Sequence, residues 1–451
     1  MIANKGNKNP RYERWRWQIF SITWICYASL YFTRKAFSVA KIGIVDDPTV
    51  NEVLTKATMA NLDALYLIAY AIGQFSWGIL ADRFGPRVVV LGGLALSVAA
   101  AVAMGTTATL PIFATMMFAQ GLAQSTGWSS LLKNLSHFFS THERGRVFGF
   151  WCTSYAFGGL VGSPFVGFWA YQVFGSWRVA FFAAAIVVAL VFVAFLVFQR
   201  NAPKDVGLPT IESYHGEPIA VLDECDRPEE EREGSWKVIR EVLSNPTVLV
   251  LGLSYFLLKP ARYAILLWGP TIVLERVPTA GKLGAVIIPS AFELAGLVGP
   301  ILIGIVSDKL FGARRMPPVI LSLAMLTVVL ALFIPLTSTG KISLIVGVLF
   351  AIGLTLYGAD SIISGAAAVD FGTAKGAGTA TGFINGCGSI GAIFGGLLPG
   401  YMDTGTLFYA FAGCAALAMV LLFPSWNRRP ATYDRSEDIR EPQQLVEARA
   451  S

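Results

Sequence analysis

The sequence predicts an all-α membrane protein in which twelve transmembrane helices form two pseudo-symmetric six-helix bundles. Three observations lead to this prediction: an apolar composition, a series of long apolar windows, and an internal repeat. Hydrophobic residues make up 54% of the 451 positions and charged residues only 14%, whereas soluble domains carry about 25% charge. The mean hydropathy is +0.58. This balance excludes a soluble globular domain.

Apolar windows mark the helices, because a helix needs about 20 apolar residues to cross the hydrocarbon core. One long polar break, at 199–245, separates two sets of six windows. We therefore predict an N-terminal bundle at 1–198, a cytoplasmic linker at 199–245, a C-terminal bundle at 246–425 and a cytoplasmic tail at 426–451. The twelve windows lie at 17–40, 60–81, 88–105, 108–138, 146–172, 178–198, 247–274, 284–307, 317–336, 342–368, 377–400 and 405–424.

Basic residues concentrate in alternate loops, and this asymmetry predicts the orientation. Lys and Arg favour the cytoplasmic side of the membrane, and the loops around 105–108, 173–176 and 400–405 carry almost none. Both termini are therefore predicted to be cytoplasmic. The formal net charge of +6 then reflects topology, and we expect no nucleic-acid partner. The basic loop positions include Lys5, Lys8, Arg11, Arg14, Arg16, Arg83, Arg87, Arg144, Arg146, Arg314, Arg315, Arg428 and Arg429.

The positions of cysteine, histidine and glycine argue against a metal site, a cofactor or catalysis. Four of the five cysteines fall within apolar windows, and the three histidines lie at or outside the predicted cytoplasmic edge. This placement favours packing over metal ligation. Glycines are frequent at 146–172 and 377–400, but they form neither a phosphate-binding loop nor a dinucleotide fingerprint. We interpret them as small residues that let helices pack closely, and we expect no enzyme activity.

Two arginines inside apolar windows are the strongest functional signal. An arginine in lipid costs about 2.5–3.5 kcal/mol on insertion scales, so it normally faces a cavity and pairs with an anion. Each arginine ends a stripe with i, i+4, i+7 spacing, and the second stripe lies 228 positions after the first (262 − 34). One guanidinium in each bundle predicts a negatively charged ligand that both bundles bind. The stripes are Tyr27, Tyr31 and Arg34, and Tyr255, Lys259 and Arg262.

A second repeat supports the same division into halves. A glycine, followed four residues later by an aspartate and a basic residue, occurs at Asp82-Arg83 and again 226 positions later (308 − 82) at Asp308-Lys309. This pattern resembles the loop signature of the major facilitator superfamily. An acidic residue at a helix end followed by a basic one can lock neighbouring helices in one conformation and release them in another. We expect a conformational role for these four residues.

Across nearly the whole chain the sequence also resembles one branch of that superfamily, the organophosphate:inorganic phosphate antiporters. The resemblance implies that an organic phosphate ester (glycerol 3-phosphate, a sugar phosphate or phosphoglycerate) is exchanged for inorganic phosphate by alternating access. It also implies that Arg34 and Arg262 bind the phosphate. We expect a monomer in a bacterial inner membrane. The matching segments are Arg11-Tyr12, Tyr31-Phe32-Thr33-Arg34-Lys35, Glu143-Arg144-Gly145, Asp205-Val206-Gly207-Leu208-Pro209, Ser244-Asn245-Pro246 and Arg262-Tyr263.

The resemblance extends to the residues of the cavity, with departures that bear on the substrate. Gln74 stands where members commonly have a lysine, Tyr155 where they have a histidine, and Trp128 in a stretch without the usual prolines. Lys259 stands where a tyrosine is usual, and Asp360 is an additional acid. We hypothesise that Lys259 contacts the organic phosphate or a second anionic group, with Asp360 as its partner when the site is empty. The predicted substrate-binding residues are Arg34, Arg262, Lys259, Tyr27, Tyr31, Tyr70, Tyr155, Tyr357, Gln74 and Trp128.

Lys35 follows Arg34 about 100° round the helix, so we expect a different role for it. The resemblance implies an ion pair between Lys35 and Glu293 that acts as a conformational latch. In an alternative, Glu293 or Asp360 carries a proton, and the protein is a proton-coupled transporter of another organic anion. In a second alternative the protein is a membrane sensor of sugar phosphate, because some relatives on this fold signal instead of transporting.

Overall fold

The computed structural model describes residues 9–215, 240, 244–311, 314–367 and 377–428. Within these ranges the chain is built from helices and contains no strand. Each predicted apolar window coincides with a helix or a run of helical segments. Eight helices in the described ranges are long and apolar enough to cross a membrane by length and composition. The predicted all-α membrane fold is therefore confirmed.

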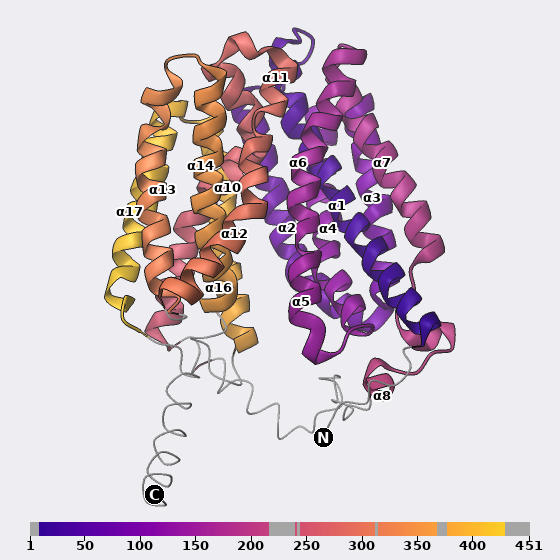
Figure 1. Ribbon diagram of the computed structural model, residues 1–451. Helices are drawn as coiled ribbons and strands as arrows, with labels where there is room; N and C mark the ends of the chain where they lie inside the picture. Colours follow the sequence, from indigo (N-terminus) through magenta and orange to yellow (C-terminus); the bar gives the residue numbers. More distant parts are fainter. Residues whose placement is uncertain (1–8, 216–239, 241–243, 312–313, 368–376, 429–451) are drawn as a thin grey trace, which may run out of the picture. The chain divides into compact units, whose positions relative to one another are not determined.

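The chain forms two compact units, and unit 1 comprises 1–224, 264–293 and 396–401. Its helical segments are α1 (Pro10–Asp46), α2 (Lys56–Phe84), α3 (Pro86–Thr106), α4 (Leu110–Ser136), α5 (Thr141–Trp151), α6 (Thr153–Gly167), η1 (Phe168–Val173), α7 (Arg178–Phe198), η2 (Pro203–Val206), α8 (Ile211–His215), η4 (Pro278–Ala280), α11 (Gly281–Ile287) and η6 (Leu398–Gly400). α4 packs against α2 and α3, and α1 packs against α6 and α7 (Figure 1). A buried apolar cluster from α1, α3, α4, α5 and α7 forms the core.

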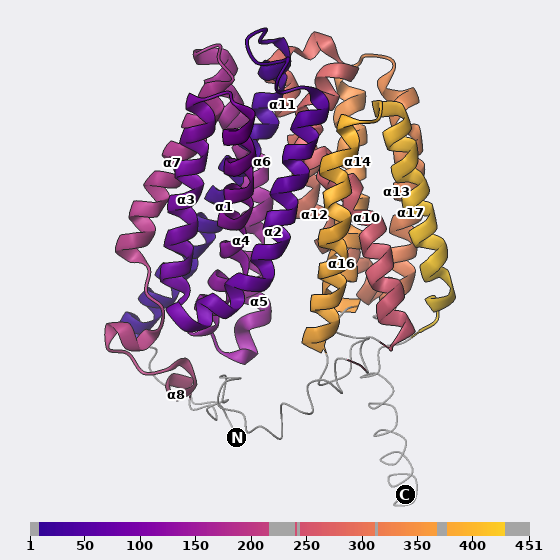
Figure 2. The same cartoon turned by 180° about the vertical axis from the view of Figure 1, so that it is seen from behind.

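Unit 2 comprises 225–263, 294–395 and 402–451. Its helical segments are α10 (Pro246–Arg276), α12 (Ser290–Leu310), α13 (Met316–Thr337), α14 (Ile342–Ser361), η5 (Ile362–Ala366), α16 (Ala377–Leu397), α17 (Thr404–Leu422) and η7 (Phe423–Ser425). α13 lies between α14 and α17 (Figure 2), and the Phe333 and Phe408 rings stack with centroids 3.7 Å apart. α10 and α12 each continue from one unit into the other, because the units divide at 263/264 and 293/294.

Local sequence explains where the first helices begin and end. Asn9 precedes Pro10, and its side-chain oxygen accepts a hydrogen bond from the Arg11 backbone N–H over 3.0 Å, which satisfies a donor that has no partner within the helix. Gly85 joins α2 to α3 with a φ of 84°, a backbone conformation that a side chain disfavours. Pro86 then starts α3 at a position where a missing N–H is tolerated. The glycine that follows the Asp82-Arg83 motif, Gly85, is thus required by this one-residue turn.

Glycines bring the backbones of neighbouring helices together. A Cβ added at Gly158 of α6 would lie 2.4 Å from the Ala28 carbonyl oxygen of α1. A Cβ added at Gly391 of α16 would lie 2.2 Å from the Phe256 carbonyl oxygen of α10. Both distances are far shorter than a van der Waals contact, so only glycine fits. These contacts confirm that the glycine-rich windows serve helix packing.

Several predicted windows are interrupted helices. The window at 146–172 consists of α5, α6 and the π-helix η1, and the window at 284–307 consists of α11 and α12 with a turn before Ser290. Pro289 lies in that turn, where its missing N–H does no harm. Most of the predicted linker and tail, 216–239 and 429–451, lies outside the described residues, so the bounds of the four predicted segments stay predictions.

Candidate functional site

Arg34 lies on α1 among neutral partners. It is only 6% exposed, and its Nε donates a hydrogen bond to Oε1 of Gln124 on α4 over 2.8 Å. The Tyr66 hydroxyl donates to the same oxygen over 2.8 Å. The guanidinium carbon lies 4.5 Å from the ring centre of Tyr31 and 5.0 Å from that of Tyr70, so aromatic faces stabilise its charge. No described carboxylate forms an ion pair with Arg34.

Gln74 joins this site through Tyr70. Both residues lie on α2, one helical turn apart, and Nε2 of Gln74 donates a hydrogen bond to the Tyr70 hydroxyl over 2.9 Å. The Tyr70 ring in turn faces the guanidinium of Arg34. Gln74 therefore orients an aromatic neighbour of Arg34, at a position where the resemblance had led us to expect a lysine.

Three other predicted residues, Tyr27 of α1, Trp128 of α4 and Tyr155 of α6, belong to or pack against the buried core of unit 1. The ring centre of Tyr27 lies 6.1 Å from that of Tyr31, 5.5 Å from that of Trp128 and 5.1 Å from that of Trp151. Tyr155 packs against the same buried core. The structure thus brings the rings of Tyr27 and Trp128 together and places Tyr155 against the same core, and a role in substrate binding remains a prediction for each.

Arg262, in unit 2, has a carboxylate partner. Its Nη1 lies 2.9 Å from Oδ2 of Asp360 on α14, and Nζ of Lys259 lies 3.0 Å from Oδ1 of the same carboxylate. One acid therefore bridges two cations that lie one turn apart on α10. Aromatic faces complete the group, because the Tyr357 ring centre lies 4.5 Å from the Arg262 guanidinium carbon and the Tyr255 ring centre 4.5 Å from the Lys259 ammonium. The expected pair of Lys259 and Asp360 is present.

A glycine on α16 makes room for the Lys259 side chain. A Cβ added at Gly388 would lie 2.3 Å from the Tyr255 ring and 3.2 Å from Cγ of Lys259. A larger residue would therefore displace the Tyr255 and Lys259 side chains. The tight packing holds the lysine beside Asp360, with only 11% of its side chain exposed.

The expected ion pair of Lys35 and Glu293 is present in unit 1. Nζ of Lys35 lies 2.8 Å from Oε1 of Glu293 in the first turn of α12, and the two side chains are 4% and 3% exposed. The same ammonium donates a hydrogen bond to the Leu266 carbonyl oxygen of α10 over 3.2 Å. Gly159 of α6 leaves space for the carboxylate, since a Cβ there would lie 2.9 Å from its oxygen. The latch role remains a prediction.

Sequence reasoning missed a second buried pair, between Lys41 of α1 and Asp63 of α2. Both side chains are essentially inaccessible, at 0% and 1% exposure. The Lys41 ammonium also donates to the Leu267 carbonyl oxygen over 3.1 Å and lies 3.7 Å from the ring centre of Trp268. The available signal was Asp63, an acid inside an apolar window, because an intramembrane acid normally has a partner. Lys41 escaped notice because α1 continues five residues beyond Lys41, to Asp46, past the predicted end of its window.

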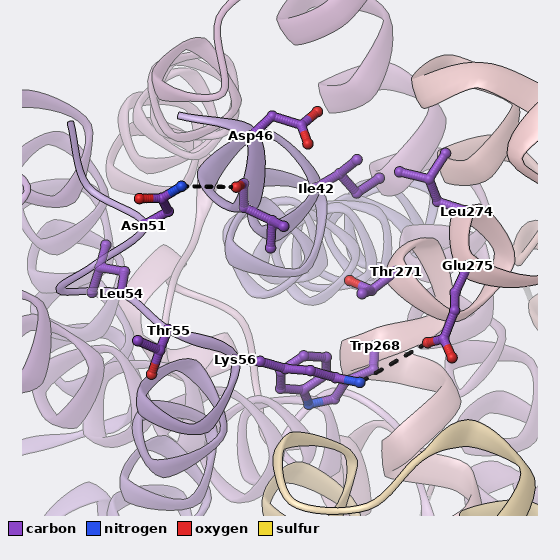
Figure 3. A pocket seen from close by; sticks show the side chains of 11 residues that line it. Ile42, Asp46, Asn51, Leu54, Thr55, Lys56, Trp268, Thr271, Leu274 and Glu275 are labelled. Atoms are coloured by element: carbon purple, nitrogen blue, oxygen red, sulfur yellow. Dashed lines mark hydrogen bonds and ion pairs between the residues drawn. The ribbon is translucent and has the colours of Figure 1, made fainter. Parts of the chain in front are cut away.

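A cavity in unit 1 is lined by the ends of α1, α2 and α10 (Figure 3). Trp268 lies in its wall, and Lys56 and Glu275 point toward each other across it with 3.9 Å between Nζ and Oε2. The remaining lining residues are apolar and polar in equal number: Ile42, Val45, Leu54 and Leu274, and Asp46, Asn51, Thr55 and Thr271. Neither Arg34 nor Arg262 is among the residues that line it, so we do not assign the phosphate to this cavity.

The repeated loop motif is only partly described. Arg83 lies exposed in the last turn of α2, and Lys309 lies exposed in the last turn of α12. The side chains of Asp82 and Asp308 lie outside the described residues. The locking role of the four residues therefore stays a prediction.

Comparison with known proteins is consistent with the observed fold. The sequence profile of the Major Facilitator Superfamily matches residues 23–396. A probable hexose phosphate transport protein of Chlamydia trachomatis is 31% identical over 94% of each chain, and the membrane sensor protein UhpC of Salmonella typhimurium is 28% identical over 95% of each chain. A bacterial homologue of the human lysosomal transporter Spinster has a similar structure, with a TM-score of 0.67 at 14% identity over 93% of this chain and 96% of the other. That last similarity concerns the fold alone.

Proposed function

The chain belongs to the Major Facilitator Superfamily, and on that premise we propose that it exchanges an organic phosphate ester for inorganic phosphate across the membrane by alternating access. The observation that most supports this proposal is the pair of buried arginines in equivalent positions of an internal repeat. Arg34 lies in unit 1 and Arg262 in unit 2, and each faces aromatic rings. A charge buried within the membrane is costly, so two of them at equivalent positions of a repeat indicate a functional site.

Phosphate suits these two arginines chemically. A phosphate monoester carries about −1.5 to −2 charges at neutral pH and presents three acceptor oxygens. A guanidinium binds two of those oxygens through parallel N–H donors and stays charged at any physiological pH. We propose that Arg34 and Arg262 both contact the phosphoryl group, and that the hydroxyls of Tyr31, Tyr70 and Tyr357 donate hydrogen bonds to phosphate or sugar oxygens.

Exchange follows from the charge of Arg34. Its neutral partners, Gln124 and the tyrosine rings, leave a buried positive charge that a bound anion compensates. A carrier with a bound anion can then cross between its inward- and outward-open states more readily than a carrier without one. Outward movement of phosphate can thereby drive inward movement of the ester.

The resemblance to bacterial transporters and the charge of the loops support a placement in the membrane. We propose a bacterial inner membrane, both termini on the cytoplasmic side and a monomer as the transporting form. In this orientation the linker and the tail are cytoplasmic. Protease accessibility of a C-terminal tag in right-side-out and inverted vesicles tests the orientation, because only the inverted vesicles should expose the tag.

The experiment that tests the transport proposal is counter-flow in proteoliposomes loaded with inorganic phosphate. Labelled glycerol 3-phosphate and glucose 6-phosphate should enter only when phosphate is present inside. Arg34→Lys and Arg262→Lys should reduce entry, whereas Arg178→Lys, which changes an arginine at the start of α7, should not. Phosphate-independent entry in the wild-type protein would contradict exchange.

A sensor is the second candidate function, because one of the similar proteins is a membrane sensor. A sensor binds the ester without moving it. In that case the purified protein would be thermally stabilised by glucose 6-phosphate but would show neither counter-flow nor phosphate self-exchange.

A further inference from the structure

Unit 2 holds one carboxylate and two cations in a single buried contact. Asp360 approaches Lys259 through one oxygen, at 3.0 Å, and Arg262 through the other, at 2.9 Å. The exposed fractions of the three side chains lie between 9% and 13%. Two positive charges and one negative charge leave a single net positive charge. Lys259 therefore adds a donor to this group but adds no net charge while Asp360 is ionised.

We propose that Asp360 is a specificity-determining residue that makes the protein select esters with one phosphoryl group and an uncharged, hydroxylated remainder. This inference rests on the proposed function, because it concerns the ester that Arg262 binds there. In this role Asp360 cancels the charge of Lys259 and rejects a substrate that carries a second anionic group. The substrate class is thus a phosphate ester of a sugar or polyol, and a phosphorylated carboxylic acid is excluded.

The Asp360 carboxylate can attract an ester with a hydroxylated remainder and repel an ester with a second anionic group. Each oxygen of an ionised carboxylate has two lone pairs, and each oxygen of Asp360 has a single cation at ion-pair distance in the described structure. A lone pair that neither a cation nor the neighbouring Tyr255 hydroxyl occupies can accept a hydrogen bond from a sugar hydroxyl. A substrate carboxylate in the same place would meet a like charge in a poorly hydrated environment, which opposes binding. Specificity then arises from attraction and repulsion together.

Lys259 is the residue that Asp360 controls. If Asp360 loses its charge, Lys259 and Arg262 lose the carboxylate that they share, and the net positive charge of this contact rises by one. Such a pair matches a molecule with two anionic groups. Gly388 leaves room for Cγ of Lys259, and Asp360→Asn keeps the size of the side chain beside the lysine, so the variant changes the charge with little change in shape.

Glycerol 3-phosphate and 3-phosphoglycerate form a matched pair of probes, because they differ mainly in a hydroxymethyl group against a carboxylate. The measurement is the ratio of the concentrations at which they inhibit labelled phosphate self-exchange in proteoliposomes. The wild-type protein should prefer glycerol 3-phosphate. In Asp360→Asn the ratio should move toward 3-phosphoglycerate by about tenfold or more, since tenfold corresponds to a single 1.4 kcal/mol interaction.

Three further variants distinguish the effect of the Asp360 charge on the ratio from a general disturbance of the structure. Asp360→Glu keeps the charge and should keep the wild-type ratio. Lys259→Met/Asp360→Asn removes one charge of each sign and should also return to the wild-type ratio. Asp403→Asn is the matched control, because it removes an acid that caps α17 in the same unit, and asparagine caps equally well; the ratio should stay unchanged.

The proposal is overturned if Asp360→Asn keeps the wild-type ratio, or if the double variant keeps the ratio of Asp360→Asn. If Asp360→Asn does not fold, the Lys259→Met variant provides the test. In that variant Asp360 lacks one of its two cations, so the ratio should move further toward glycerol 3-phosphate. An unchanged ratio would refute the proposal. If the wild-type protein exchanges no phosphate, the proposed transport fails separately. The same two ligands are then compared by thermal stabilisation of the purified protein, and the same shifts are expected in binding.

Discussion

The two buried arginines come from one sequence repeat, yet their surroundings differ in charge. Arg34 is held by the amide oxygen of Gln124 and by aromatic faces, whereas Arg262 contacts the carboxylate of Asp360. Unit 1 contains buried carboxylates as well, but each pairs with a lysine, Glu293 with Lys35 and Asp63 with Lys41.

The comparison shows that the sequence repeat keeps a buried arginine in each unit but does not keep the group that neutralises its charge. In unit 1 the acids are bound by lysines one to one, so Arg34 keeps a full charge for a ligand. In unit 2 a single acid serves two cations. Among these buried groups, each unit therefore retains one net positive charge by a different route. The variants below break or sharpen this comparison, from the largest expected effect to the smallest.

Breaking a one-to-one pair of unit 1 should have the largest effect. Lys41→Met leaves the Asp63 carboxylate buried without its cation, and removal of one partner of such a pair typically costs about 3–5 kcal/mol. Lys41→Met/Asp63→Leu removes both charges and should recover most of this loss. The free energy of unfolding of each variant is measured in mixed detergent micelles and compared with that of the wild type. A Lys41→Met protein as stable as the wild type would show that the pair is not closed off from water.

The next effect compares the two arginines directly. Arg34→Lys should lower phosphate exchange about a hundredfold, because lysine loses the two-pronged contact and the two buried lysines of α1, Lys35 and Lys41, already pair with carboxylates. Arg262→Lys should lower exchange only about tenfold, because Lys259 remains one turn away. Initial rates in proteoliposomes measure both, with Arg178→Lys as the control. Equal losses would contradict the asymmetry between the two sites.

A carboxylate beside Arg34 should make unit 1 resemble unit 2. Gln124→Glu places an acid where the amide oxygen now accepts the Arg34 hydrogen bond. The acid competes with the ligand, and the apparent affinity for phosphate should fall about tenfold. Gln124→Leu removes the hydrogen bond without adding charge and should lower affinity only slightly. A fall of the same size in both variants would assign the effect to the lost hydrogen bond.

The smallest effect concerns the feature that the two sites share. Tyr31 lies over Arg34 and Tyr357 over Arg262, each with 4.5 Å between the ring centre and the guanidinium carbon. Tyr31→Leu and Tyr357→Leu should each lower exchange about threefold, in line with the modest energy of a cation–π contact. Replacement by Phe retains the ring and separates the contribution of the face from that of the hydroxyl. A large loss in only one leucine variant would mean that the rings have unequal roles.

The sequence by itself determined the helices, their approximate ends and the equivalence of Arg34 and Arg262. Apolar length and the i, i+4, i+7 spacing are local properties, and they fix which residues share one face of a helix. The Lys35–Glu293 and Lys259–Asp360 pairs were also expected, but only from the resemblance and from the additional acid.

Only the tertiary structure decided which charge each cation meets. Asp360 lies 98 positions after Arg262, and its contact with both cations depends on how α14 is rotated against α10. Asp63 contacts Lys41 because α1 extends beyond the apolar window and packs against α2 at that level. Helical periodicity determines which residues share one face of a helix. The residues that this face contacts depend on the rotation and axial position of the neighbouring helix, and these depend on packing across the whole unit.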